Sequence, residues 1–320
     1  MPILSDALTL EIADRVTLTG DVVRIDLARP DGEPLPPFVA GAHVDVVVGD
    51  GLVRQYSLCN DPAERHRYQI AVLRERRSRG GSERVHADFH PGRQVTVGLP
   101  RNLFALAPHG RRHILVGGGI GITPLLSMAA ALRAQCKPFE LHYCSRDAAA
   151  AAFAEKVEML GGRQYHSRQE GSSRFDPATA IGTPDDAAHI YVCGPAGFMT
   201  AVRDTALRLG WTAGNLHQEL FEAADLSSHP GDQPFDVRIA STGAVFAIPP
   251  GATIARVLAA AGIDLPISCE QGICGTCVTS VLDGVPDHRD SYLTDEEHAV
   301  GDLITPCCSR ARSPVLLLDL

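Results

Sequence analysis

The chain has 320 residues, of which 45% are hydrophobic and 21% are charged, and its 30 Gly and 22 Pro are spread along its length. Because domains cluster at roughly 100 to 150 residues, two or three domains are expected. Residues 226–320 carry 12 Asp and Glu against 5 Lys and Arg, so they hold −7 of the net charge of −9. This balance argues against nucleic-acid binding, which rewards clustered Lys and Arg, and favours a partner with a basic patch.

The N-terminus does not predict export. Residues 1–15 contain no basic segment followed by an apolar core and a cleavage site. Residues 114–132 lack charges, but their four Gly and one Pro favour a buried strand, turn and helix over a membrane span. Nine Cys without an export signal make a disulfide framework unexpected. A cytoplasmic protein that does not bind membranes is therefore predicted.

Residues 9–105 consist of short runs in which apolar and polar residues alternate, separated by Gly and Pro turns. This pattern predicts a β-barrel. Within it, the segment RQYSLCN at 54–60 follows a predicted strand. Gly80, Gly81 and Ser82 stand at the start of a predicted helix, which is an anion-binding arrangement. Taken singly, an exposed Arg–Tyr pair and an ordinary turn explain these strings equally well.

From residue 113 the pattern changes to short apolar strands that alternate with Ala-rich helices at 124–135, 151–160 and 197–210. Such alternation predicts a parallel α/β sheet. The first strand leads through the glycine-rich turn GGGIGITP into a helix that starts near Pro124. Backbone amides at such a helix start can face a pyrophosphate, although a simple tight turn is the alternative because the G-x-G-x-x-G fingerprint is absent.

Two later strand ends carry polar or glycine-containing motifs. Ser145 and Arg146 end the second strand of this region, where a ribose contact is expected, and Cys193, Gly194 and Pro195 follow a later strand. Open α/β sheets bind ligands at the carboxyl ends of their strands, so these residues are candidates for nucleotide binding. A solvated surface charge is the alternative for Arg146.

Residues 223–234 combine Ser, Pro, Gly and Asp without periodicity, which predicts an interdomain linker. A third domain is expected to begin near Phe235. Its first residues predict a β-hairpin at 236–251 and a short helix at 253–262, and a Cys-rich loop follows.

Cys269, Cys274 and Cys277 have the spacing C-x4-C-x2-C, and Cys307 follows thirty residues later. This is the ligand spacing of plant-type [2Fe–2S] clusters. Four thiolates also suit a structural zinc ion, but zinc ribbons generally pair two short C-x2-4-C knuckles. Cys307 and Cys308 are adjacent, and the string TPCCSRA resembles ferredoxin-type sequences in which the first Cys is the ligand. Cys307 is therefore the predicted fourth ligand.

The series R-x-Y-S-L, G-G-S, GGGIGITP, C-G-P and C-x4-C-x2-C…C resembles the phthalate dioxygenase reductase family over nearly the whole chain. The resemblance implies an FMN-binding β-barrel at 1–107 and an NAD-binding α/β domain with a parallel sheet at 108–224. A linker at 225–234 would precede a plant-type [2Fe–2S] ferredoxin domain at 235–320, with the α+β architecture of the β-grasp fold.

The resemblance also implies an NADH-dependent oxidoreductase that is the reductase component of a Rieske-type oxygenase. Hydride would pass from NADH to FMN, and single electrons would pass through the [2Fe–2S] cluster to the oxygenase, which would dock transiently and electrostatically at the acidic ferredoxin domain. FMN is favoured over FAD by the domain order. The alternative is an iron–sulfur flavoprotein that acts as a redox sensor or donates to another electron acceptor.

Carried over position by position, the resemblance gives each motif a role. Arg54 would neutralise the FMN phosphate, Tyr56 would pack on the flavin, and Ser57 would hydrogen-bond near flavin N5. The nicotinamide would lie between Ser57 and Cys193, the two predicted catalytic residues, and Phe221 would cover the isoalloxazine. The predicted cofactor-binding residues are Arg54, Tyr56, Ser57, Leu58, Ala71, Leu73, Gly80, Gly81, Ser82, Gly118, Gly119, Thr123, Ser145, Arg146, Cys193, Gly194, Pro195 and Phe221.

Overall fold

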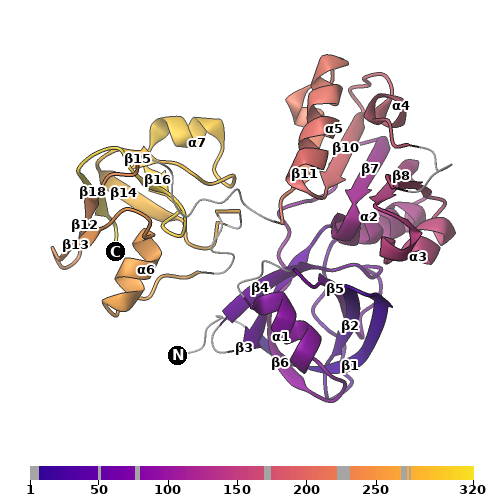
Figure 1. Ribbon diagram of the computed structural model, residues 1–320, viewed down its shortest axis with the longest axis horizontal. Coiled ribbons are helices and arrows are strands. Elements are labelled where there is room, and N and C mark those ends of the chain that lie inside the picture. Colours follow the sequence, from indigo (N-terminus) through magenta and orange to yellow (C-terminus); the bar gives the residue numbers. More distant parts are fainter. Residues whose placement is uncertain are drawn as a thin grey trace. The chain divides into compact units, whose positions relative to one another are not determined.

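A computed structural model of the chain describes residues 7–49, 52–75, 80–168, 174–221, 231–267, 272–273 and 275–320 (Figure 1). The chain forms two compact units, Met1–Phe221 and Glu222–Leu320. Most of the predicted linker lies outside the described residues.

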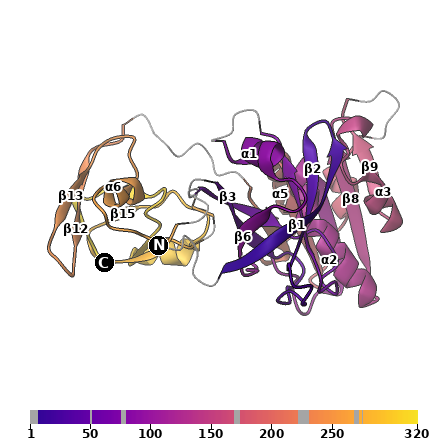
Figure 2. The same cartoon turned by 90° about the horizontal axis from the view of Figure 1, so that it is seen from below.

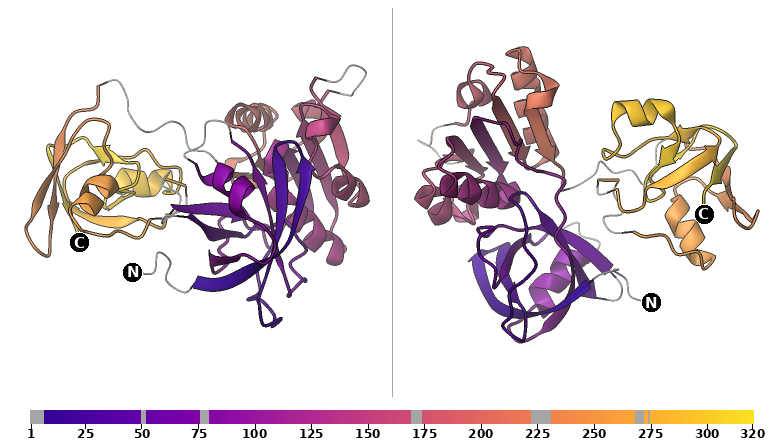
Figure 3. Two further views of the ribbon diagram at one scale, coloured as in Figure 1. Left: turned by 60° about the horizontal axis from the view of Figure 1, so that its bottom comes forward. Right: turned by 180° about the vertical axis from the view of Figure 1, so that it is seen from behind.

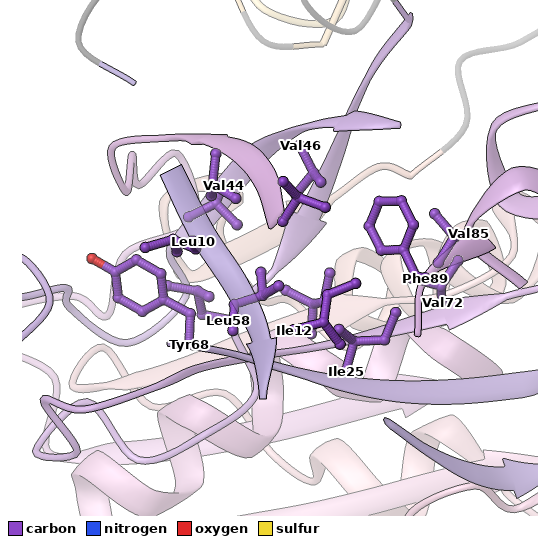
Figure 4. Close-up of a cluster of buried hydrophobic side chains, with 14 of the residues drawn as sticks. Leu10, Ile12, Ile25, Val44, Val46, Leu58, Tyr68, Val72, Val85 and Phe89 are labelled. Carbon is purple, nitrogen blue, oxygen red and sulfur yellow. The ribbon is translucent and has the colours of Figure 1, made fainter. Parts of the chain in front are cut away.

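The first unit opens with a six-stranded antiparallel sheet in the order β4-β3-β6-β1-β2-β5, of which β1, β2, β3 and β6 are labelled in Figure 2. Its elements are β1 (Ala7–Thr19), β2 (Val22–Ala28), β3 (His43–Gly49), β4 (Leu52–Ser57), β5 (Tyr68–Leu73), helix α1 (Gly81–Asp88) and β6 (Gln94–Gly98). Side chains alternate between the two faces of a strand, so Leu10, Ile12 and Val44 point into one shared, fully buried core (Figure 4). Val85 of α1 and the adjacent Phe89 complete that core.

A five-stranded parallel sheet follows, in the order β11-β10-β7-β8-β9. Its strands are β7 (Arg112–Gly118), β8 (Phe139–Ser145), β9 (Arg163–His166), β10 (Ala188–Cys193) and β11 (Leu216–Glu219). Its helices are α2 (Ile122–Ala134), α3 (Ala154–Met159), α4 (Pro177–Ile181) and α5 (Ala196–Arg208), with 3-10 turns η1 (Gly119–Gly121), η2 (Ala148–Ala150) and η3 (Ala213–Asn215). Leu115 and Leu141 pack with α2 and α3, while Ile114 and Ile190 pack with α4 and α5, so helices cover both faces.

The charge-free run at 114–132 forms β7, η1 and the first part of α2, as predicted. Among the residues that the structure describes, no helix is both long enough and apolar enough to cross a membrane.

Two local predictions were inaccurate. The helix expected at 151–160 is shorter, because the Asp147 side chain accepts a hydrogen bond from the Ala150 amide and caps a separate turn, η2, before α3 begins. The RQYSLCN segment begins inside β4 and does not follow the strand, since Arg54 and Tyr56 are already paired with β3.

The second unit contains a five-stranded sheet in the order β13-β12-β18-β14-β16 and a two-stranded sheet of β15 and β17. In Figure 3 this unit is the part coloured orange to yellow. Its strands are β12 (Phe235–Ile239), β13 (Val245–Ile248), β14 (Thr279–Asp283), β15 (Pro286–Asp287), β16 (Leu303–Ile304), β17 (Arg310–Ala311) and β18 (Val315–Leu318). Its helices are α6 (Ile254–Ala260) and α7 (Asp295–Val300). The hairpin β12–β13 and helix α6 match the sequence prediction, and Ile254 and Leu258 of α6 pack on Val237 and Leu316 of the sheet.

A buried network of charged residues links the start of this unit to its later strands. Asp232 pairs with Arg289, with 2.5 Å between Oδ1 and Nη2, and lies 3.7 Å from Nε of Arg310. The Arg310 guanidinium, which is almost fully buried, also donates to the carbonyl oxygens of Ala252 and Gln233. Since buried charges are costly unless they are paired, this network favours one arrangement of the unit.

Candidate functional site

Three side chains from three strand ends come together in the first unit. Ser57 ends β4, and its Oγ donates a hydrogen bond to Oε2 of Glu219 over 3.2 Å. Glu219 ends β11 and is the register partner of Cys193 at the end of β10. Ser57 and Cys193 were predicted from the sequence, whereas Glu219 was missed. The parallel pairing of β10 and β11 brings Glu219 to them.

The protonation states at this site follow from burial. Burial raises the pKa of the Glu219 carboxyl to about 8, although the hydrogen bond from Ser57 acts in the opposite direction. Burial, reinforced by the Glu219 carboxyl, also raises the pKa of the Cys193 thiol well above its usual value. At neutral pH the site therefore holds a neutral thiol and a carboxyl that can gain or release a proton.

Arg54 lies against the amino-terminal end of α1, as a phosphate site would require. A Cβ atom added at Gly81 would stand 2.9 Å from Nε of Arg54, so the guanidinium lies close against the helix start. Gly80 precedes the helix with a φ of 92°, and the Ser82 hydroxyl accepts a hydrogen bond from the Glu75 amide. A guanidinium beside backbone amides at a helix start fits a phosphate.

The remaining predicted flavin residues have different surroundings. Tyr56 is half-buried against the barrel core, and burial raises the pKa of its phenol. The Leu58 side chain is fully buried inside that core. Ala71, Leu73 and Phe221 contact a second cluster, whose members come from both the barrel and the parallel sheet. Their assignment to a flavin stays a prediction.

The glycine-rich turn after β7 packs against the turn after β10. A Cβ atom at Gly121 would lie 2.6 Å from the backbone nitrogen of Gly194, and one at Gly118 would lie 3.2 Å from Cδ of Pro195. Glycine is therefore required for the two turns to touch. Together they form one surface at the carboxyl ends of the strands, where open α/β sheets bind nucleotides.

The start of α2 completes this turn. Gly119 has a φ of 56°, which places it in the left-handed region that favours glycine. Thr123 is buried in the first turn of α2, and its hydroxyl donates to the carbonyl oxygen of Ile120. The hydroxyl of Thr123 thus stabilises the turn itself, and its contact with a pyrophosphate stays a prediction.

At the end of β8, the Ser145 hydroxyl donates to the Asp147 carbonyl oxygen and lies 2.8 Å from Nδ1 of His166. Arg146 is exposed, and its carbonyl oxygen accepts a hydrogen bond from the Arg168 amide over 2.8 Å. The fold therefore brings a second arginine next to Arg146 in space, which sequence proximity did not reveal.

In the second unit, Cys277, Cys307 and Cys308 are buried in one small cluster. The predicted ligands Cys269 and Cys274 lie outside the described residues. Buried thiols gathered in one cluster fit an iron–sulfur centre, which thiolates hold.

Two glycines of the Cys-rich loop adopt left-handed backbone conformations, with φ values of 70° at Gly272 and 68° at Gly275. A Cβ atom at Gly275 would collide with the Tyr292 ring, and one at Gly272 would collide with Sγ of Cys308. The Cys308 Sγ lies 3.2 Å from the Thr305 hydroxyl. The loop can therefore fold closely over these side chains only with glycine at both positions.

Comparison with known families identifies two domains. The family described as "2Fe-2S iron-sulfur cluster binding domain" matches residues 237–312. The family described as "Oxidoreductase NAD-binding domain" matches residues 115–204.

Similar proteins extend over almost the entire chain. It is 48% identical over 304 residues to a vanillate O-demethylase oxidoreductase of Pseudomonas sp. (strain HR199 / DSM 7063), covering 94% of this chain and 96% of the relative. The solved structure of a phthalate dioxygenase reductase, described as modular for electron transfer from pyridine nucleotides to [2Fe–2S], has a TM-score of 0.77 and 41% identity, with 98% of each chain covered. An intact type IV self-sufficient cytochrome P450 monooxygenase has a TM-score of 0.83 and 37% identity, with 98% of this chain matching 41% of that one.

Proposed function

The chain belongs to the phthalate dioxygenase reductase family, which includes the vanillate O-demethylase oxidoreductases, and we propose that it is the reductase component of an oxygenase system. It takes hydride from NADH and delivers single electrons through a [2Fe–2S] cluster. The observation that carries this proposal is the meeting of Ser57, Cys193 and Glu219 at strand ends next to the glycine turns of the nucleotide-binding region.

When bound, FMN supplies chemistry that accepts two electrons together and releases them singly, and the iron–sulfur cluster supplies a one-electron carrier. The protein binds and orients these groups. Arg54 and the start of α1, including Gly80, Gly81 and Ser82, hold the flavin phosphate, and the turns after β7 and β10 hold the nicotinamide nucleotide. Cys277 and Cys307, with Cys269 and Cys274, hold the iron.

Glu219 can exchange a proton at this site. The Ser57 hydroxyl donates to the Glu219 carboxyl and orients it, and that carboxyl gains or releases its proton near pH 8. Cys193 remains a neutral thiol, because its pKa is raised by burial, and it excludes water from the same surface.

We further propose that the partner is a Rieske-type oxygenase that docks transiently on the ferredoxin unit. The names of the relatives support an oxygenase partner, and the −7 charge of residues 226–320 supports electrostatic docking by a basic surface. Exposed charges at the edge of an interface act mainly on the rate at which the two proteins associate, and salt screens them. Raising the ionic strength should therefore slow electron delivery to the partner. A cytoplasmic location is also part of this proposal, and cell fractionation tests it.

A different electron acceptor is the second candidate. The likeness to part of a self-sufficient cytochrome P450 monooxygenase favours it, since the matching region there belongs to a chain with a haem acceptor by name. A purified P450 that accepts electrons from this chain faster than any Rieske oxygenase does would favour this second candidate.

The central experiment is anaerobic titration of the purified protein with NADH, followed by visible spectroscopy. Bleaching of flavin and iron–sulfur absorption, with subsequent reduction of cytochrome c, is expected. A chain truncated after Ala223 should still oxidise NADH with ferricyanide but should no longer reduce cytochrome c, because the iron–sulfur unit is missing. Full-length protein that binds both cofactors yet is not reduced by NADH would favour a redox sensor and contradict the proposal.

A further inference from the structure

Three metal-ligating side chains other than the cysteines meet in the second unit. His288 and Asp290 lie between β15 and α7, and His298 belongs to α7. One potential ligand atom from each lies within 4.8 Å of the others. Nε2 of His298 is 3.4 Å from Oδ2 of Asp290, and Nδ1 of His288 is 3.8 Å from Oδ1 of Asp290. The two imidazole rings stack with centroids 4.3 Å apart.

The hydrogen bonding of this group is incomplete. The His288 side chain is only 10% exposed, and the Asp290 side chain is fully buried. Both ring nitrogens of His288 are buried and have no hydrogen-bond partner in the part of the chain that the structure describes. A buried polar atom without a partner costs about 1 to 3 kcal/mol, so a bound ligand that pairs with a ring nitrogen of His288 would remove this cost.

We propose that His288, Asp290 and His298 bind one divalent transition-metal ion of the Zn²⁺ type. Two imidazoles and one carboxylate are a donor set that suits Zn²⁺, and three protein ligands leave a fourth position for water. A lone pair on the unpartnered His288 imidazole reaches the same ion as His298 once one of the two stacked rings turns.

Neighbouring groups hold the carboxylate in place for this role. Oδ2 of Asp290 accepts the Leu293 amide over 2.8 Å, and Oδ1 accepts the Ser309 hydroxyl over 3.3 Å. Such outer hydrogen bonds orient a ligand and are typical of built metal sites.

The site adjoins the Cys-rich loop. The amide of Ser291 donates to the carbonyl oxygen of Gly272 over 2.9 Å, and a Cβ atom at Gly272 would stand 2.9 Å from Cα of Asp290. A dication beside this loop stabilises an added electron by Coulomb attraction. Metal binding therefore raises the reduction potential of the iron–sulfur cluster and slows electron delivery, a regulatory consequence that rests on the proposed function, whereas metal binding itself does not.

The test uses full-length protein with its flavin and iron–sulfur cluster loaded, treated with EDTA and dialysed. Isothermal titration with ZnCl₂ should show one tight site per chain. His298→Gln and His288→Asn should weaken its Kd by about tenfold or more, since losing even an outer hydrogen bond to a ligand costs that much. The matched control is Glu296→Gln on the exposed side of α7, which removes a nearby charge but no ligand and should bind as wild type does.

Iron is counted in every sample, so a variant that loses its cluster is recognised. X-ray absorption at the zinc edge of the wild type needs no variant: nitrogen and oxygen ligands support the site, and sulfur in the shell overturns it. Absence of tight binding, or equal binding by all variants, also overturns it. A cluster potential that does not move when zinc binds overturns the regulatory consequence. None of these measurements requires NADH oxidation, so they test the metal site independently of the proposed reductase function.

Discussion

Replacing Glu219 with glutamine should change the pH dependence of stability in a defined direction. The pKa of this carboxyl is raised from 4.5 to about 8 in the folded chain. Between these values the folded chain retains the proton that the unfolded chain has released. Each rise of one pH unit in this window therefore favours unfolding by up to about 1.4 kcal/mol. Below pH 4.5 both states are protonated, and the effect vanishes.

Over the whole window the limit is about 5 kcal/mol, and the residual solvent contact of the residue reduces it to about 2 kcal/mol. Glutamine has the same size, cannot ionise and still accepts from the Ser57 hydroxyl. Glu219→Gln should therefore be more stable than wild type at pH 8, with a Tm higher by about 4 to 8 °C. At pH 5 the two proteins should melt within a small margin of each other.

The measurement is thermal unfolding followed by flavin fluorescence at pH 5 and pH 8, with both proteins saturated with FMN. Glu155→Gln is the control, because it removes one exposed carboxyl from α3 of the same unit. A Tm difference that is equal at both pH values, or a variant that is less stable at pH 8, would refute the reasoning. In anaerobic stopped-flow experiments the wild type should also show a rate transition near pH 8 that Glu219→Gln lacks, since the group that titrates is gone.

Further predictions concern the second unit and the nucleotide. Cys307→Ser should lose iron while Cys308→Ser retains it, because thiolates at four positions hold the cluster; iron per chain measures this, and the reverse pattern would make Cys308 the ligand. NADH should be preferred over NADPH in kcat/KM. A wild-type preference for NADPH that disappears in Arg146→Ala combined with Arg168→Ala would instead show that these two arginines read the 2′-phosphate. Arg310→Gln should destabilise the ferredoxin unit by about 2 kcal/mol, because buried carbonyl oxygens lose their charged donor. The measurement is the temperature midpoint at which the iron–sulfur absorbance is lost, and a midpoint equal to that of the wild type would contradict the prediction.

The sequence alone determined the features that depend on neighbours along the chain. The C-x4-C-x2-C spacing lies within nine residues, so its chemistry could be recognised without a fold. The helix start at Gly81 and the glycine turn before α2 are also local, because turn and cap preferences are set by a few adjacent residues. The division into a strand-rich region, an alternating region and a Cys-rich region followed from the periodicity of apolar residues.

Only the tertiary structure decided which distant side chains meet. Glu219 is 162 residues from its hydrogen-bond partner Ser57, and it reaches the site because β11 lies beside β10 at the edge of the sheet. Arg168 comes next to Arg146 through the pairing of β9 with β8, which the spacing of charges along the chain could not disclose. A raised pKa likewise depends on how much protein surrounds a carboxyl, and burial of a polar side chain is set by packing between elements that are remote in sequence.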